Sequence, residues 1–220
     1  MTPEISIILA THNRAELLAR ALHSIAQQTH QNWELIVVDD GSSDTTPDLL
    51  KAHAAKEPRL RIVRQKNAGL AAARNAGIQA ATADLIAFQD DDDMSPPQRL
   101  ETCAAAMRAH PQWDALEHDF LLCDENGEPS EYRGQGWRMF MRRSLWQRVG
   151  GYRPFFRSQE DVDFWMRAEE AGAQVGALRE PLYYVASSRQ EAGAAVSHVG
   201  TAQHAQKYWL IAKACAAMRR

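Results

Sequence analysis

The sequence has few cysteines, no long apolar run and no excess of positive charge. Its 220 residues include three cysteines, Cys103, Cys123 and Cys215. Three widely spaced cysteines form neither a zinc-ligand pattern nor a disulfide framework, which favours a reducing environment. No apolar stretch is long enough to span a bilayer, and the N-terminus lacks the basic leader of a signal peptide. We therefore expect a soluble, cytoplasmic protein.

The formal net charge of −3 provides no basic surface for a nucleic-acid backbone. Nucleic acid is therefore not an expected partner. The hydrophobic share of 45% and the charged share of 24% are those of an ordinary globular protein, so a chain of 220 residues can bury the core of one domain.

Short apolar runs alternate with helical patterns over residues 5–89. Residues 5–10 are almost continuously apolar, as in a strand buried on both faces, whereas Leu18, Leu22 and Ile25 recur at helical spacing. Strands that alternate with helices predict an α/β fold with a mostly parallel, doubly wound sheet and helices on both faces. The expected strands are residues 5–10, 33–38, 60–64 and 84–89, and the expected helices are residues 17–25, 44–56 and 70–81.

The second half of the chain has weaker patterns. Residues 187–220 are expected to form a polar loop and an amphipathic helix packed on the domain, with a partner subunit or an anionic membrane as alternative docking sites. The other expected elements are a helix opening at Pro96, a strand at 113–123, a hairpin turn at 124–127, a strand at 137–141, helices at 143–149 and 160–171, and edge strands at 174–178 and 182–185.

Polar residues follow three of the expected strands at their carboxyl ends. They are residues 11–13, 39–40 and 90–93. In doubly wound sheets, ligands bind beyond the carboxyl ends of the strands, where such side chains meet. The sequence therefore predicts a binding site at this edge of the sheet.

Four consecutive aspartates, residues 90–93, are the most informative of these segments. Adjacent carboxylates repel one another, so a positive group should lie among them. Because alternate side chains of an extended segment share a face, Asp90 and Asp92 can converge on one ion. Carboxylate oxygens suit Mg²⁺, Mn²⁺ or Ca²⁺. The alternative is a solvated acidic turn.

In their order and spacing, the polar segments resemble glycosyltransferase family 2, the inverting nucleotide-sugar transferases with the GT-A fold. The resemblance covers residues 4–185. It implies a GT-A domain at 1–186, with a nucleotide-sugar-binding half (1–93) and an acceptor half (94–186). The segments that carry it are residues 6–14, 37–44, 67–75 and 90–92, the last similar to the DxD metal motif, and residues 142–145, 149–152 and 160–165, which are similar to the acceptor half with its ED motif.

The resemblance implies a divalent metal, Mn²⁺ or Mg²⁺, at the DxD-like segment. It assigns Asp92 as the first metal ligand. Asp90 is either a second ligand or a ribose contact, and Asp91 can also reach the ribose. Asp93 is equally well explained as a structural cap of the turn.

On the base side of the donor, Asp40 is similar to the base-binding aspartate of the family. A carboxylate can accept a hydrogen bond from the imide N–H of uracil or thymine, which disfavours cytosine. The alternative is that Asp40, like Asp39, only shapes the turn with Gly41. His12 either stacks on the base or is an ordinary loop histidine, and Ala10 contributes backbone groups.

Asn67, Gly69 and Arg74 are expected beside the donor. Gly69 allows close approach of the backbone, and the start of a helix favours an anion. Arg74 either reaches the donor or pairs with the aspartates, and both can hold at once. The segment that closes over the diphosphate in the family has no clean match here, where Arg189 and His198 are the candidates.

An inverting transfer needs a carboxylate that takes the proton from the acceptor hydroxyl. The resemblance assigns this role to Asp161, and Glu160 then orients the base or the acceptor. The alternative for Glu160, Asp161 and Asp163 is capping of a helix start. Trp137 and Trp165 are either sugar-stacking platforms or core residues.

We therefore expect a hexosyltransferase-type enzyme that moves a sugar from a UDP- or dTDP-sugar to a saccharide or lipid-linked acceptor, in the synthesis of cell-surface polysaccharide or glycolipid. Two alternatives are a nucleotidyltransferase and a non-catalytic nucleotide-sugar binder. The first would need a Gly-rich basic loop after the first strand, which residues 11–14 do not provide. The second would be favoured if Asp161 lay far from the metal.

Overall fold

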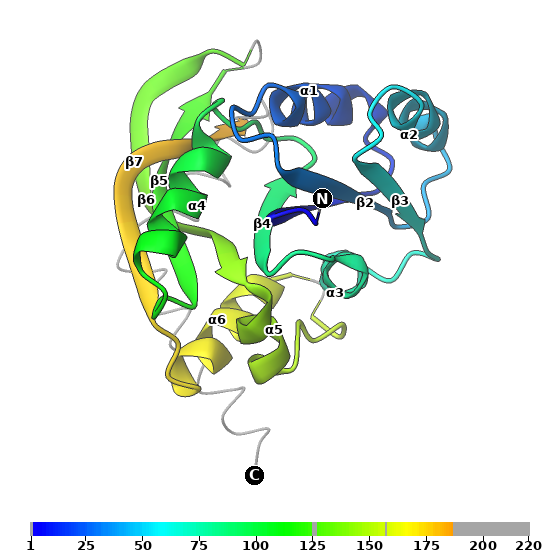
Figure 1. Ribbon diagram of the computed structural model, residues 1–220. Coiled ribbons are helices and arrows are strands. Elements are labelled where there is room, and N and C mark those ends of the chain that lie inside the picture. The colour runs from blue at the N-terminus through cyan, green and yellow to red at the C-terminus, as the bar shows by residue number, and fades with distance from the viewer. Residues whose placement is uncertain (1, 125–126, 157, 187–220) are drawn as a thin grey trace.

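A computed structural model describes residues 2–124, 127–156 and 158–186 (Figure 1). Within these residues, seven strands form one sheet in the order β3-β2-β1-β4-β6-β5-β7. The strands are β1 (Ile5–Thr11), β2 (Trp33–Asp39), β3 (Leu60–Arg64), β4 (Leu85–Asp90), β5 (Ala115–Cys123), β6 (Pro129–Arg142) and β7 (Val175–Ala186). The helices are α1 (Ala15–Ala26), α2 (Thr46–Ala54), α3 (Leu70–Ala80), α4 (Arg99–Ala109), α5 (Arg143–Val149) and α6 (Glu160–Glu170).

The first four strands run parallel and end at the same edge of the sheet. In the register of β1, Thr11 lies opposite Asp39 of β2, and Ala10 lies opposite Asp90 of β4. Strand β6 pairs antiparallel with β4 and with β5, and β7 pairs parallel with β5. The polar residues that follow β1, β2 and β4 are therefore gathered at one edge, as the sequence predicted.

Helices cover both faces of the sheet (Figure 1). One core contains Ile7 and Leu9 of β1 together with the apolar residues of α1, α2 and α4. The other contains Ile8 of β1 and the apolar residues of α3, α5 and α6. Alternate residues of a buried strand point to opposite faces, so an almost continuously apolar run serves both cores. No helix in the described part of the chain is both long and apolar enough to cross a membrane.

Two predictions for the second half were wrong in extent. The strand expected at 137–141 runs over Pro129–Arg142, and the two edge strands expected after residue 174 are one strand, β7. β7 includes the polar residues Arg179 and Glu180, and its pairing with β5 shifts register on both sides of Asp119, so the strand continues through them. The start of β6 lacks an apolar pattern, and its Gly134 lies against the Phe120 ring, where a Cβ would come within 2.0 Å.

Candidate functional site

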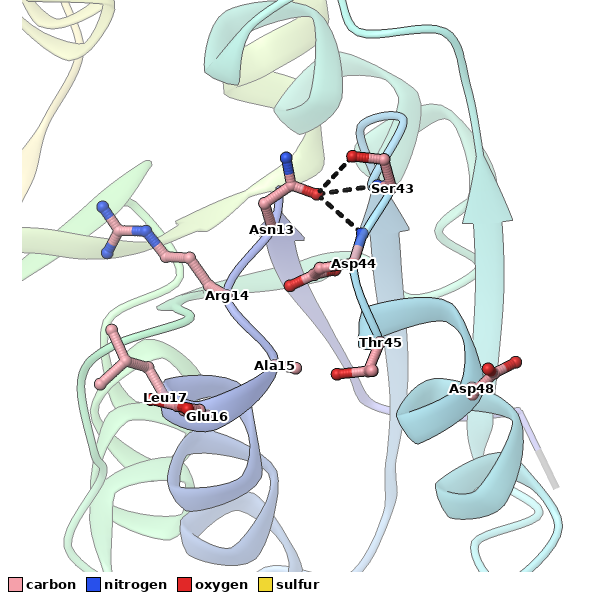
Figure 2. A pocket seen from close by; sticks show the side chains of 9 residues that line it. All are labelled: Asn13, Arg14, Ala15, Glu16, Leu17, Ser43, Asp44, Thr45 and Asp48. Atoms are coloured by element: carbon pink, nitrogen blue, oxygen red, sulfur yellow. Dashed lines mark hydrogen bonds between the residues drawn. The ribbon is translucent and has the colours of Figure 1, made fainter.

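The loops that follow β1 and β2 are joined by Asn13. This residue has a positive φ of 54°, which asparagine tolerates better than most residues. Its side-chain oxygen accepts hydrogen bonds from the backbone N–H of Ser43 at 2.8 Å and of Asp44 at 3.3 Å (Figure 2). These hydrogen bonds lie beside an open pocket of about 610 Å³ between the starts of α1 and α2. The pocket is lined by Asn13, Arg14, Ala15, Glu16, Leu17, Ser43, Asp44, Thr45 and Asp48.

The two aspartates that end β2 have different partners. The buried Asp39 accepts the Ser42 backbone N–H at 2.8 Å, which shapes the turn as the sequence suggested. The buried Asp40 accepts hydrogen bonds from the Gln65 amide at 2.7 Å and from the backbone N–H groups of Ala68 at 2.9 Å and Gly69 at 2.8 Å. Asp40 therefore fixes the loop that leads into α3.

The Asp40 carboxylate still has acceptor capacity. A carboxylate offers about four acceptor positions, and these three donors use Oδ1 twice and Oδ2 once. Gly69 has a φ of 89°, which lets the chain turn sharply into α3 beside this carboxylate. The exposed side chains of His12 and Asn67 come from the loops after β1 and before α3. Asp40 is therefore hydrogen-bonded to the loop before α3, which contains both Asn67 and Gly69.

All four aspartates at the end of β4 have partners, and Arg14 lies near two of them, Asp91 and Asp92. Asp90 accepts a hydrogen bond from Arg74 at 3.1 Å, and Asp91 accepts one from the Thr11 hydroxyl at 2.7 Å. The remaining two contacts are an ion pair between Arg14 and Asp92, with N and O 2.5 Å apart, and a hydrogen bond from the Ala186 backbone N–H to Asp93 at 2.9 Å.

These aspartates carry more negative charge than the neighbouring arginines neutralise. Burial raises the pKa of Asp91 to about 6. Burial and the charges of Asp90 and Asp92 hold the pKa of Asp93 well above its usual range, and burial also raises the pKa of Asp90 although Arg74 opposes this. A cluster of hard oxygen donors that is short of positive charge fits a divalent cation.

Within the described residues, no three His, Cys, Asp or Glu side chains are placed to hold a metal ion by themselves. Asp90 and Asp92, the pair expected to converge on one ion, are each bound to a different arginine, Arg74 and Arg14. A cation at this edge would therefore need further ligands from water or from a bound anion. Diphosphate oxygens are ligands of that kind.

Arg74 connects the aspartates to the start of α6. Its guanidinium lies 2.9 Å from Glu160 and 3.1 Å from Asp90, and it faces the rings of Phe88 and Tyr152 at 5.5 and 5.8 Å. Burial would lower the pKa of Arg74, but its acidic neighbours, Asp90 first, more than offset this and raise it. Arg74 is therefore a permanent positive charge in the centre of the site.

The three acidic residues at the start of α6 are separated by their surroundings. Glu160 is buried against Arg74, and burial raises its pKa. Asp163 is buried in an ion pair with Arg167 at 2.7 Å and has a structural role. Asp161 is exposed, and its carboxylate accepts the Val162 backbone N–H. Of the three, Asp161 is the carboxylate that is exposed to solvent.

Several site residues had no clear signal in the sequence. Arg14 is an ordinary loop arginine until the fold brings it to Asp92, and Asn13 looks like a turn residue. Trp165 packs against the core on the α6 side, which supports its core interpretation. The side chain of Trp137 and the residues Arg189 and His198 lie outside the described part of the chain.

Comparison with known proteins gives a family match over most of the chain. Residues 6–159 match the model of Glycosyl transferase family 2. The putative glycosyltransferase EpsE of Bacillus subtilis is 35% identical over 83% of this chain and 73% of its own length. The putative glycosyltransferase EpsH of the same organism is 30% identical over 83% of this chain and 60% of its own length.

Solved structures share the fold at lower identity. The structure of S. aureus TarS 1–349 in complex with UDP has a TM-score of 0.72 and 23% identity, and the match covers 86% of this chain and 62% of that one. The mannosyltransferase PcManGT from Pyrobaculum calidifontis, in complex with GDP-Man and Mn²⁺, has a TM-score of 0.71 and 20% identity. This match covers 86% of the present chain and 59% of the mannosyltransferase.

Proposed function

Since the chain belongs to glycosyltransferase family 2, we propose that it is a metal-dependent, inverting enzyme that moves a sugar from a nucleoside diphosphate to an acceptor hydroxyl. The observation that carries this proposal is the edge where β1, β2 and β4 end. It combines a buried carboxylate that retains acceptor capacity, Asp40, with an acidic turn that is short of positive charge. A nucleobase can donate a hydrogen bond to Asp40, and the acidic turn can hold the cation that binds a diphosphate.

The donor is a UDP- or dTDP-sugar in this proposal. The open acceptor position on Asp40 suits the imide N–H of uracil or thymine, with Ala10, His12 and Asn67 around the base and ribose. Guanine also presents an N–H that a carboxylate can accept, and PcManGT was solved with GDP-Man. The titration described below therefore includes GDP beside UDP and dTDP.

Asp92 and Asp90 would hold Mn²⁺ or Mg²⁺, and Asp91 would contact the ribose. When bound, the ion neutralises the charge that develops on the leaving diphosphate. Because Asp92 pairs with Arg14, binding of a cation there competes with this arginine. Arg74 keeps its positive charge beside Asp90 and supports the same diphosphate.

Asp161 takes the proton of the acceptor hydroxyl in this proposal. It is exposed at the start of α6, whereas its neighbour Glu160 is buried and bound to Arg74. The Arg74–Glu160 contact fixes the first turn of α6 relative to the aspartates. The acceptor is a saccharide or lipid-linked sugar that enters from the acceptor half, and the pathway is synthesis of cell-surface polysaccharide or glycolipid.

Calorimetric titration tests the donor site. UDP, dTDP, GDP and CDP are titrated into wild type with Mn²⁺ or with EDTA, and into Asp92→Asn. We expect metal-dependent binding of UDP or dTDP that Asp92→Asn abolishes. The matched control is Asp84→Asn, since Asp84 is exposed at the opposite end of β4 and should leave binding unchanged. Nucleotide binding that is the same in Mn²⁺ and in EDTA, and the same in wild type and Asp92→Asn, would refute the proposed donor site.

A further inference from the structure

Buried side chains hold the two ends of the aspartate turn, residues 90–94. The turn lies between Gln89, the residue before Asp90, and Ser95, the residue after Met94. The Ser95 hydroxyl donates a hydrogen bond to the Gln89 side-chain oxygen at 2.6 Å, and both residues are buried. This contact joins the two ends of the turn.

Arg99 of α4 holds both ends of the turn at once. One guanidinium nitrogen donates to Gln89 Oε1 at 3.2 Å and to Ser95 Oγ at 2.8 Å. The other donates to the carbonyl oxygens of Phe88 at 2.7 Å and of Met139 at 3.4 Å. The side chain of Arg99 is 1% exposed, and its Nε has no partner among the described residues.

The acceptors of Arg99 in the described part of the chain are all neutral oxygens. A buried guanidinium without a paired carboxylate is costly, and an apolar side chain would fill the same core space at lower cost. Burial lowers the pKa of Arg99, and Asp90 and Asp93 are among the groups that oppose this shift without cancelling it. A simple packing role does not explain an arginine at this position.

Tyr183 of β7 completes the arrangement. Its ring lies 4.6 Å from the Arg99 guanidinium, and its hydroxyl accepts hydrogen bonds from the Asp90 backbone N–H at 2.9 Å and from Gln89 Nε2 at 3.3 Å. The same hydroxyl donates a hydrogen bond to the Asp93 carboxylate, which lowers the pKa of that carboxyl against the larger effect of burial. One buried phenol therefore contacts the first and the last aspartate of the turn.

We propose that Arg99, Gln89, Ser95 and Tyr183 are positioning residues that hold the aspartate turn in the conformation that binds the divalent cation and the diphosphate. The inference rests on the metal-dependent donor site proposed above. Fixed partners behind metal-binding carboxylates are worth about 10- to 100-fold in metal affinity. The buried positive charge also offsets the repulsion among the carboxylates, and this offset operates at short range in a low-dielectric interior.

Removal of single hydroxyl groups tests the inference. Tyr183→Phe removes one oxygen, and its matched control is Tyr184→Phe on the adjacent residue, which is less buried. Affinities for Mn²⁺ with UDP, and in parallel with GDP, are measured by calorimetry, and folding is followed by circular dichroism. We expect Tyr183→Phe to bind Mn²⁺ about tenfold more weakly or worse. Any nucleotide binding that wild type retains in EDTA should be unchanged in Tyr183→Phe, and every affinity of Tyr184→Phe should match wild type.

A second pair of variants distinguishes positioning from general stability. Ser95→Ala should also weaken Mn²⁺ binding, whereas Ser6→Ala removes a buried hydroxyl at the opposite end of β1 and should affect stability alone. Arg99→Lys should restore more Mn²⁺ affinity than Arg99→Met. If Tyr183→Phe fails to fold, Ser95→Ala carries the test.

The outcomes separate the two claims. If wild type binds Mn²⁺ with nucleotide and both Tyr183→Phe and Ser95→Ala match its affinity, the positioning inference is wrong and the donor site stands. If wild type itself shows no metal-dependent nucleotide binding, the donor site is wrong and the positioning inference fails with it.

Discussion

At the scale of single residues, the site shows how partners give identical side chains different roles. Asp39 shapes a turn, and Asp40 fixes the loop before α3. The sequence predicted which residue types would gather at this edge. It could not predict their partners, because the donors to Asp40 come from a loop about 25 positions away in the chain.

The first prediction concerns the loop before α3. Asn in place of Asp40 has one acceptor oxygen and cannot satisfy the three donors, so one buried N–H is left without a partner. Asp40→Asn should lower the free energy of unfolding by about 1–3 kcal/mol, measured by urea denaturation. Asp48→Asn on the exposed surface of α2 is the control and should change it by less than about 0.5 kcal/mol. Equal effects of the two substitutions would contradict the role given to Asp40.

The second prediction is a pH dependence of stability. Burial lowers the pKa of His118 to about 3 from an ordinary value of 6.5, and the charge of Arg99 acts in the same direction. Between these values the unfolded chain binds a proton that the folded protein does not. Stability therefore falls as the pH is lowered from about 6.5 towards 3, by up to about 1.4 kcal/mol per pH unit.

His118→Asn removes this titration and keeps a donor for the Asp119 carbonyl. Its unfolding free energy, measured between pH 4 and pH 7, should change with pH less steeply than that of wild type, whatever its absolute value. Parallel curves for the two proteins would show that His118 is not neutral in the folded state.

At the scale of elements, the strand ends define the site and the helix starts connect it. The strong periodicity of residues 5–89 made β1 to β4 and α1 to α3 predictable from the sequence. The polar start of β6 and the bulged β7 were not, since their order comes from pairing with β5 and their own patterns are weak. Arg74 connects α3 to β4 and to α6 through its ion pairs with Asp90 and Glu160, and the sequence alone did not predict both contacts.

The third prediction tests this link. Arg74→Met leaves the buried Glu160 and the half-buried Asp90 without their shared cation and should destabilise the protein by about 3 kcal/mol, measured by calorimetric melting. Arg74→Lys keeps the charge but cannot contact Asp90 and Glu160 at once. Its stability should therefore lie between those of Arg74→Met and wild type. Arg108→Met, at a half-exposed ion pair with Glu4, should change stability by less than about 1 kcal/mol. A similar loss in the two methionine variants would contradict the central role of Arg74.

At the scale of the molecule, one sheet contains strands from both the proposed donor half and the proposed acceptor half. The predicted α/β class and the GT-A fold are confirmed by the strand order and by the likeness to solved glycosyltransferases. Strand order and the long β6 and β7 depend on contacts far apart in the chain, so local patterns could not give them. The roles of Asp161, Asp92 and Asp40 stay predictions, and the tail proposed at 187–220 lies outside the described residues.

The central claim is that the acidic turn and Asp161 together perform sugar transfer. The direct measurement is release of nucleoside diphosphate from UDP-, dTDP- and GDP-sugars, with water or a saccharide mixture as acceptor, in Mn²⁺ and in EDTA. We predict that wild type with Mn²⁺ releases nucleotide from at least one donor and that EDTA stops it. Asp161→Asn should bind the donor normally but release nucleotide about 100-fold more slowly. Glu170→Gln, at the far end of α6, should match wild type.

Release that continues in EDTA, release by Asp161→Asn at the wild-type rate, or no release from any donor would contradict the account.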